Sequence, residues 1–322
     1  MTVGAAKASR WSASLFGPLM DIRASNDWQA RVTALVVTVN SAHCMPGLGS
    51  GLRDMRHVIV IDNASDDDTL HQTGLHLPQA RVLAQATNLG FGAANNLGWR
   101  AADTEFIFLI NPDCVCSSAA IAQLVRTADA HPNASVVAPQ LLDRRGQPDT
   151  SYRWRADNWV SRGQGAQGIC SVGFVCGAAM LIRRAAMQQV DGFDESFFLY
   201  YEDEDLCLRL QDRFGPILVD PDAQMQHLSR SSVAGQRRMH YEFIRGFHHI
   251  QSKFLFGRKH FGREVGSMRR WIYGLSAIAE TLVRLLLFDL RRGSRCAGRV
   301  AGVVGYRSQP MPPPAGIGKS RS

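Results

Sequence analysis

The sequence has 322 residues, a net charge of +8 and a hydrophobic fraction of 45%. These values are ordinary for a folded globular protein with a sizeable core, built as one large domain or one domain with an appendage. The seven cysteines argue against a zinc site, because Cys114-x-Cys116 and the pair Cys170 and Cys176 lack its regular ligand spacing. An odd number of scattered thiols is typical of a reducing cytosol.

The excess positive charge lies in the C-terminal third, where residues 228–307 hold many arginines and lysines. Such a region indicates an anionic partner, which is a membrane surface, a phosphate-bearing substrate or nucleic acid. We expect no nucleic-acid partner, because the sequence has no aromatic–basic RNA motif, zinc finger or convincing helix-turn-helix. Residues 1–30 lack a continuous apolar signal-peptide core, so we predict a cytoplasmic protein.

Strands and helices alternate after an N-terminal arm, which we predict over residues 1–30. Short apolar runs predict buried strands over residues 34–39, 58–61, 81–84 and 106–110. Stretches of helical length lie between these strands, over roughly residues 43–56, 66–76 and 91–102. This alternation predicts an α/β fold with a Rossmann-like, mostly parallel central sheet and flanking helices.

Polar residues stand where three of these strands end: Asn40, Asp62 and the run Asn111-Pro112-Asp113. Ligands bind at the carboxyl ends of strands in open α/β sheets, so we expect these ends to converge on one crevice. Any one of them alone would more often be a helix N-cap. Asp62 differs, because it directly ends the apolar run, ahead of the capping residues Ser65 and Asp66.

The second half of the chain is less regular. Residues 140–170 predict a long loop or insert, and residues 172–182 predict a turn followed by a buried strand. Helices are predicted over residues 204–213, 241–262 and 271–290. The last is a poor membrane span, because Glu280, Arg284 and Asp289 interrupt it; we expect it to pack on the domain or lie in a bilayer interface. The predicted organisation is therefore an arm (1–30), a main domain (31–250), a basic helical extension (251–305) and a disordered tail (306–322).

An aromatic segment, Phe197 to Tyr201, runs directly into four acids, Glu202 to Asp205. Adjacent carboxylates repel one another and are costly to bury. The arrangement is explained if at least one acid sits in a partly dry site as a base. The alternative is an acidic helix start, since Asp and Glu favour the first turn of a helix.

Five motifs in order resemble family-2 inverting glycosyltransferases with the GT-A fold, most closely the rhamnosyltransferase-type branch that builds bacterial surface polysaccharide. The motifs are Val37-Thr38-Val39-Asn40-Ser41, Ile61 to Asp67, Asn88 to Asn95, Leu109-Ile110-Asn111-Pro112-Asp113 and Tyr201 to Asp205. The resemblance covers roughly residues 31–260, and it identifies residues 31–250 as a GT-A glycosyltransferase domain followed by a C-terminal helical extension.

The resemblance implies a nucleotide-sugar donor and a divalent cation, Mg²⁺ or Mn²⁺. It implies donor contacts from Thr38, Asn40, Asp62, Asn88, Gly90, Asn111 and Asp113. Asp113 matches the last acid of the family's DxD metal motif. His227 stands where the family can have a His that completes the metal site or contacts the pyrophosphate. Asn111 replaces the first acid of that motif, which should weaken the metal site.

An inverting transfer needs one carboxylate to take the proton of the acceptor hydroxyl. The resemblance assigns this role to Asp203, with Glu202 as second choice. It places Gly177 and Asp194 on the acceptor side. Arg230, Arg237 and Arg238 are further candidates for binding a phosphate, because arginine suits bidentate phosphate contacts.

We therefore expect transfer of a sugar, with rhamnose favoured by the branch, to a polyprenyl-linked saccharide at the inner face of the cytoplasmic membrane, with peripheral contact to anionic lipid. Two alternatives stay open. One is a nucleotidyltransferase acting on sugar phosphates, although no Gly-rich phosphate loop follows the first strand. The other is an inactive homologue that binds a sugar nucleotide. A dinucleotide-dependent oxidoreductase is disfavoured, because no Gly-x-Gly-x-x-Gly follows that strand.

Overall fold

The computed structural model describes residues 27–150, 152–153, 164–228 and 238–306. The predicted tail, from residue 307 on, and residues 1–26 of the predicted arm lie outside these ranges, as do Arg230 and Arg237. The short helix α1 (Trp28–Arg31) leads directly into the central sheet.

Four parallel strands form one half of a nine-stranded sheet, in the order β3-β2-β1-β4. They are β1 (Val32–Thr38), β2 (His57–Asp62), β3 (Arg81–Ala84) and β4 (Phe106–Ile110). The apolar runs predicted each of them to within two residues. Alternate side chains of β1 reach opposite faces of the sheet, Val36 into one apolar cluster and Leu35 into the other. Both faces are covered by helices, which is why the strands are continuous apolar runs.

The helices of this half follow the predicted alternation. They are α2 (Met45–Leu52), which a 3₁₀ turn η2 (Ala42–Cys44) precedes, α3 (Thr69–His76), α4 (Phe91–Arg100) and α5 (Ser118–Ala130). The N-cap of α5 is Ser117, whose hydroxyl accepts a hydrogen bond from the backbone N–H of Ala120 at 3.2 Å.

The other half of the sheet is mixed. β10 (Ala179–Arg183) lies antiparallel between β4 and β6 (Val136–Leu142), and β11 (Ile217–His227) runs parallel to β6. Two short strands, β5 (Cys114–Val115) and β8 (Cys170–Val172), pair antiparallel with β11. A separate ribbon joins β7 (Tyr152–Arg153) to β9 (Phe174–Val175). The predicted α/β fold is confirmed, and parallel pairing is concentrated among the first four strands and β6–β11.

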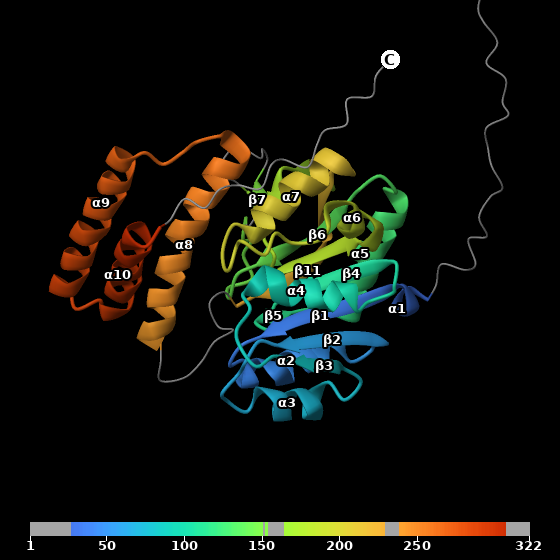
Figure 1. The fold of residues 1–322 in the computed structure, drawn as a ribbon. Coiled ribbons are helices and arrows are strands. Elements are labelled where there is room, and N and C mark those ends of the chain that lie inside the picture. Colours follow the sequence, from blue (N-terminus) through green and yellow to red (C-terminus); the bar gives the residue numbers. More distant parts are fainter. Residues whose placement is uncertain (1–26, 151, 154–163, 229–237, 307–322) are drawn as a thin grey trace, which may run out of the picture.

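Two helices follow the strand β10: α6 (Arg184–Val190) and α7 (Glu202–Arg213), which begins at the acidic cluster. Three further helices complete the chain. They are α8 (Arg238–Phe261), α9 (Ser267–Leu286) and α10 (Leu290–Val304), and α10 packs against both of the others. Figure 1 shows them as a group beside the sheet domain, with α9 outermost.

The predicted C-terminal extension is present, and its first helix runs continuously across the predicted boundary at residue 250. The predicted helix over residues 271–290 corresponds to α9 from residue 271 on, but it ends at Leu286, and a turn then leads into α10 at Leu290. Glycines allow close helix contact here: a Cβ added at Gly246, Gly298 or Gly302 would collide with the backbone of the facing helix. Of the helices that the structure describes, none is long and apolar enough to cross a bilayer.

Candidate active site

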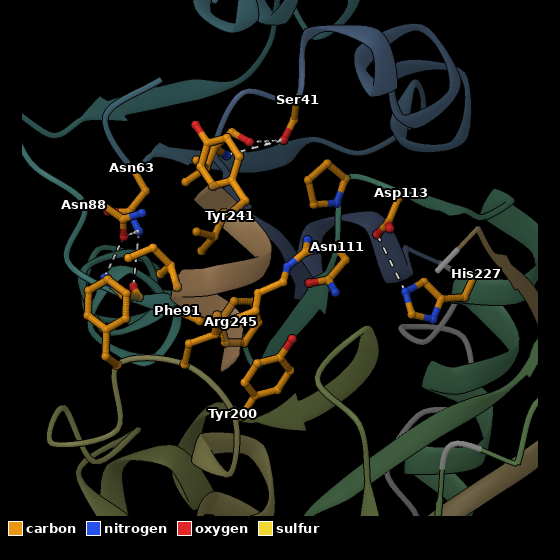
Figure 2. Close-up of a pocket in the computed structure, with 17 residues that line it drawn as sticks. Ser41, Asn63, Asn88, Phe91, Asn111, Asp113, Tyr200, His227, Tyr241 and Arg245 are labelled. Carbon is orange, nitrogen blue, oxygen red and sulfur yellow. Dashed lines mark hydrogen bonds and ion pairs between the residues drawn. The ribbon is translucent and has the colours of Figure 1, made fainter. Parts of the chain in front are cut away.

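A cavity of about 310 Å³ opens where β1, β2 and β4 end, and we call it the strand-end cavity. Its walls come from the strand ends, from the start of α4, from the aromatic segment and from α8. Figure 2 shows Tyr241 of α8 next to Ser41 and Asn63 at the strand ends, with Arg245 farther into the cavity and Tyr200 on the far side from Ser41. The predicted crevice therefore exists, and α8 forms a wall that the sequence motifs do not include.

Thr38 and Asp62 lie behind the cavity rather than in its lining. Both side chains are buried, at neighbouring register positions of β1 and β2. The Thr38 hydroxyl donates to Asp62 Oδ1 at 3.1 Å, and the Ser65 hydroxyl donates to the same oxygen at 2.5 Å. The Ser65 backbone N–H donates to Asp62 Oδ2 at 3.1 Å. This network fixes the strand ends, and direct donor contact by Thr38 and Asp62 stays a prediction.

Asn40 connects the sheet to α8. Its backbone adopts a left-handed conformation with φ of 49°, and its side-chain Nδ2 donates to Asp66 Oδ1 at 2.6 Å and to the Tyr241 hydroxyl at 2.7 Å. Asp66 returns a hydrogen bond from its backbone N–H to Asn40 Oδ1 at 2.8 Å. Tyr241 lines the cavity and was not predicted, because 201 residues separate it from Asn40.

Asn88 and Gly90 both line the cavity, and Figure 2 shows Asn88 next to Asn63 at the end away from Asp113 and His227. Asn63 Nδ2 donates to Asn88 Oδ1 at 2.9 Å and to the Gly90 carbonyl at 3.2 Å. Gly90 has φ of 89°, and a Cβ there would lie 2.5 Å from the carbonyl oxygen of Phe198. That same carbonyl accepts from the Phe91 N–H at 3.0 Å. The glycine is therefore required for contact with the aromatic segment, and its role toward a donor stays a prediction.

Asn111, Asp113 and His227 lie at the other end of the cavity (Figure 2). Asp113 Oδ1 is 3.6 Å from His227 Nε2, because β5 pairs with β11 and brings the two residues together. The Cys114 thiol completes a group of possible ligands within 4.8 Å. Burial raises the pKa of Cys114 well above its usual value, so this sulfur stays protonated. A carboxylate oxygen and an imidazole nitrogen facing a cavity suit Mn²⁺ or Mg²⁺.

Asp203 is held by backbone amides beside the cavity wall. The Gly177 N–H donates to Asp203 Oδ2 at 2.9 Å, and the Glu204 N–H donates to Oδ1 at 2.9 Å. A Cβ added at Gly177 would lie 3.2 Å from the Phe91 ring and 3.5 Å from Asp203 Cβ. Phe91 lines the cavity. The structure thus brings together the predicted base and the predicted acceptor residue Gly177, next to the wall formed by Phe91.

Glu202 is nearly inaccessible, with 5% of its surface exposed. Burial first, and then the neighbouring Asp203 carboxylate, raises the pKa of Glu202 well above its usual value. Its Oε2 atom is buried and makes no hydrogen bond with any described residue. Burial therefore favours the neutral form of Glu202 next to the Asp203 carboxyl.

Asp194 and Asp205 bind α8 to the segments around the acidic cluster. Lys259 of α8 lies 2.5 Å from Asp194 Oδ2 and 2.6 Å from Asp205 Oδ1. Asp205 also pairs with His260 at 2.7 Å and, within α7, with Arg209 at 2.7 Å. Asp194 therefore already pairs with Lys259 and accepts a hydrogen bond from Ser196, and its role toward the acceptor stays a prediction.

Comparison with known proteins agrees with this geometry. The chain is 27% identical over 269 residues to N-acetylglucosaminyl-diphospho-decaprenol L-rhamnosyltransferase of Mycobacterium tuberculosis, covering 74% of this chain and 86% of that protein. It is 27% identical over 178 residues to rhamnosyltransferase WbbL of Escherichia coli, covering 49% of this chain and 67% of that one. The solved mannosyltransferase PcManGT from Pyrobaculum calidifontis, in complex with GDP-Man and Mn²⁺, is 15% identical with a TM-score of 0.51 and 85% coverage of both chains, which indicates a shared fold.

A family model settles the choice among the enzyme classes considered above. Residues 34–191, from the first strand to the end of α6, match the model for glycosyl transferase family 2. The matched range contains four of the five motifs and ends just before the acidic cluster. It decides against a nucleotidyltransferase. The chain belongs to glycosyl transferase family 2 and is a glycosyltransferase with the GT-A fold.

Proposed function

We propose that this enzyme moves a sugar from a nucleotide-sugar donor to a lipid-linked saccharide in a single inverting displacement. One observation carries the proposal: the pair of Asp113 and His227 lies at one end of the strand-end cavity, while Asp203 adjoins the wall of the same cavity at Phe91. An in-line displacement needs a site for the leaving diphosphate and a separate base for the attacking hydroxyl.

Asp113 and His227 would hold a divalent cation, Mg²⁺ or Mn²⁺, which neutralises the charge on the leaving diphosphate. The donor role of the neighbouring residues follows from their positions. Asn88, Gly90 and Asn111 line the cavity, and Asn40, Thr38 and Asp62 fix the strand ends behind it. A nucleotide bound there would meet a largely preformed surface, because Thr38 already bonds to Asp62, Asn40 to Tyr241 and Asn88 to Asn63.

Asp203 would take the proton as the acceptor oxygen attacks the anomeric carbon and the bond to the diphosphate breaks. The N–H groups of Gly177 and Glu204 bind one carboxylate oxygen each and so fix the orientation of the base. Protonated Glu202 leaves Asp203 as the single proton acceptor of the cluster's first turn that faces Gly177.

The acceptor and the cellular site follow from the relatives and from α9. The mycobacterial relative is named for a decaprenyl-diphosphate acceptor, and both named relatives are rhamnosyltransferases. The outward face of α9 leaves Trp271, Leu275 and Leu286 exposed at 66%, 59% and 79%. Exposed arginines follow at the start of α10, including Arg292. An apolar helix face flanked by arginines supports peripheral contact with an anionic membrane, at its cytoplasmic side.

A thermal-shift panel of nucleotide sugars, with and without Mn²⁺, tests the donor assignment. We expect one nucleotide sugar to raise the melting temperature selectively, and more so with Mn²⁺. Transfer is then measured from that donor to a prenyl-diphosphate saccharide, with the anomeric configuration of the product read by NMR. Retention of configuration would overturn the single displacement. Selective donor binding with no transfer to any prenyl-diphosphate saccharide would instead indicate the inactive homologue.

A further inference from the structure

A second cavity, of about 560 Å³, lies between α8 and the start of α9, and we call it the cationic cavity. Its lining includes Tyr201 from the aromatic segment, Lys253 from α8, Arg263 from the connecting loop and Arg269 from α9. None of the residues that line it is acidic. It shares no lining residue with the strand-end cavity.

The positive charge around this cavity is uncompensated. Most cations of α7, α8 and α10 pair with carboxylates, such as Lys259 with Asp194 and Asp205. Lys253, Arg263 and Arg269, in contrast, form no ion pair with any residue that the structure describes. Three unpaired cations around one concave surface attract an anion and provide donors for phosphate oxygens.

Aromatic rings and one unsatisfied nitrogen complete the lining. Lys253 Nζ lies 4.7 Å from the centre of the Tyr273 ring, and Phe254 packs against the same ring at 5.5 Å. His249 also lines the cavity, and its buried Nδ1 has no hydrogen-bond partner among the described residues. Burial, with Arg299, Arg295 and Lys253 nearby, lowers the pKa of His249 to about 4, so its imidazole is neutral at pH 7. The surface therefore suits a ligand with an anionic group and a less polar body.

Two consecutive residues link this cavity to the catalytic carboxylates. Tyr200 lines the strand-end cavity and Tyr201 lines the cationic cavity. Both have φ of 69°, a left-handed conformation that non-glycine residues rarely adopt. Glu202 and Asp203 follow directly. A ligand in the cationic cavity would thus lie next to the segment that delivers the proposed base.

An apolar groove of about 340 Å³ lies along the same turns of α9 as the cationic cavity, but on a different face of that helix. Trp271, Leu275 and Ile278 of α9 and Val304 of α10 line it. Arg270 lines the groove while its neighbour Arg269 lines the cationic cavity. The apolar groove and the cationic cavity therefore lie on two sides of the same turn of α9.

We infer that the cationic cavity binds the diphosphate of a prenyl-diphosphate-linked acceptor, with the saccharide directed toward Asp203 and the prenyl chain along the apolar groove. This inference rests on the proposed function, because it names the site of the acceptor for that transfer. Lys253, Arg263 and Arg269 are the diphosphate ligands. The donor and the acceptor then approach from opposite sides of Tyr200 and Tyr201.

Direct binding tests the inference without turnover. The probe is farnesyl diphosphate, titrated into the full-length protein by calorimetry. We expect the double variant Lys253→Ala/Arg269→Ala to bind it at least about tenfold more weakly than wild type, and the matched control Arg53→Ala, at an exposed position of α2's C-cap, to bind it as wild type does. Farnesol, which lacks the charged diphosphate, should bind with the same affinity to wild type, to the double variant and to the Arg53→Ala control. Equal farnesyl diphosphate affinity in all three overturns the inference.

Steady-state kinetics provides the second arm. The same double variant should raise KM for a prenyl-diphosphate saccharide at least about tenfold, with KM for the donor unchanged and with no effect on a neutral alkyl glycoside acceptor. A wild-type enzyme that binds farnesyl diphosphate yet transfers no sugar would reject the proposed function and leave this site standing. The single variants Lys253→Met and Arg269→Gln serve if the double variant has a lowered melting temperature.

A third arm separates a diphosphate from an anionic lipid headgroup. Binding to phosphatidylglycerol vesicles should be nearly the same for the double variant and for wild type. Loss of vesicle binding with unchanged farnesyl diphosphate affinity would assign these cations to the membrane surface and overturn the inference.

Discussion

The strand-end cavity and the C-terminal helices differ in how far their polar and apolar side chains are buried and paired. Around the cavity, Asn40, Asp62 and Asn63 are buried, and each is hydrogen-bonded to a neighbouring polar side chain: Asp66, Ser65 and Asn88 respectively. In the helices, Lys253 and Arg269 remain unpaired among the described residues and Phe288 is 88% exposed. The first region is organised before a ligand arrives, whereas the second leaves charge and apolar surface exposed, as the proposed binding of a lipid-linked acceptor requires.

The largest effect should come from the carboxylates at the junction of the two regions. Asp203→Asn removes the proposed proton acceptor while keeping the shape of the side chain, and we expect kcat to fall by about 10²- to 10⁴-fold. Glu202→Gln is uncharged, the form that burial favours for Glu202 itself, so activity should stay within about tenfold of wild type. Both kcat values are measured with saturating donor, and donor affinity by calorimetry. Equal losses in the two variants would place the base elsewhere.

The next largest effect should come from substituting Asp205, which attaches α8 to α7. Burial alone would raise the pKa of this carboxyl, but His260, Arg209 and Lys259 together hold it at about 2. Asp205→Asn leaves these cations facing a neutral group, and we expect a loss of about 3–5 kcal/mol in the free energy of unfolding at pH 7.

The pH dependence of this loss in unfolding free energy provides the control for the Asp205→Asn prediction. A carboxyl with a depressed pKa stabilises the fold above its unfolded value, which is near 3.9, and loses this contribution as the pH falls toward 2. The difference in unfolding free energy between wild type and Asp205→Asn should therefore narrow between about pH 4 and pH 2. A difference that is constant over this range would show that the ion pairs contribute nothing.

A smaller effect on stability is expected from Gly→Ala substitutions, and its sign should differ between a packed glycine of the sheet domain and an exposed one. A Cβ at Gly98 in α4 would collide with Leu35 and lie 2.7 Å from Ile61 Cδ1, so Gly98→Ala should destabilise by about 1–3 kcal/mol. Gly74 in α3 has open space around it, and Gly74→Ala should stabilise by up to about 1 kcal/mol through helix propensity. Urea unfolding curves measure both. Changes of the same sign would contradict the packing argument.

The smallest effect on folding should come from the exposed turn between α9 and α10. Leu286→Ser and Phe288→Ser alter side chains that are 79% and 88% exposed, so the free energy of unfolding should change by less than about 0.5 kcal/mol. Cosedimentation with phosphatidylglycerol vesicles should nevertheless weaken, because each side chain would lose its burial in lipid. Leu75→Ser, at a 60% exposed position of α3, is the matched control. Unchanged cosedimentation in all three variants would remove this turn from the membrane contact.

The strands β1, β2 and β4 could be predicted because each contains a run of apolar, β-branched or aromatic residues, as parallel strands buried on both faces require. β3, at the edge of the sheet, is largely exposed and has a weaker apolar pattern. β6 could not be predicted in this way, since Pro139 and Gln140 interrupt its apolar residues. Its place in the sheet depends on pairing with β10 and β11, which are distant in sequence. α10 was missed for a related reason: its glycines have low helix propensity and are retained for contact with α8.

The site was predictable where its residues belong to a motif and not where they depend on packing. Asp113 and Asp203 were named from their motifs, and the resemblance supplied His227, whose contact with Asp113 depends on the pairing of β5 with β11. Tyr241 and Arg245 carry no local signal, because they reach the cavity only through the docking of α8. The protonated state of Glu202 likewise depends on burial that only the folded chain supplies.

The left-handed pair Tyr200 and Tyr201 has a consequence for how ligands on its two sides influence each other. Each such residue costs roughly 1–2 kcal/mol relative to an ordinary conformation. The intervening peptide unit cannot rotate for one tyrosine without moving the other. A ligand that rotates this peptide unit on one side would therefore change the affinity for a ligand on the other side, and thermodynamic reciprocity makes the two changes in affinity equal.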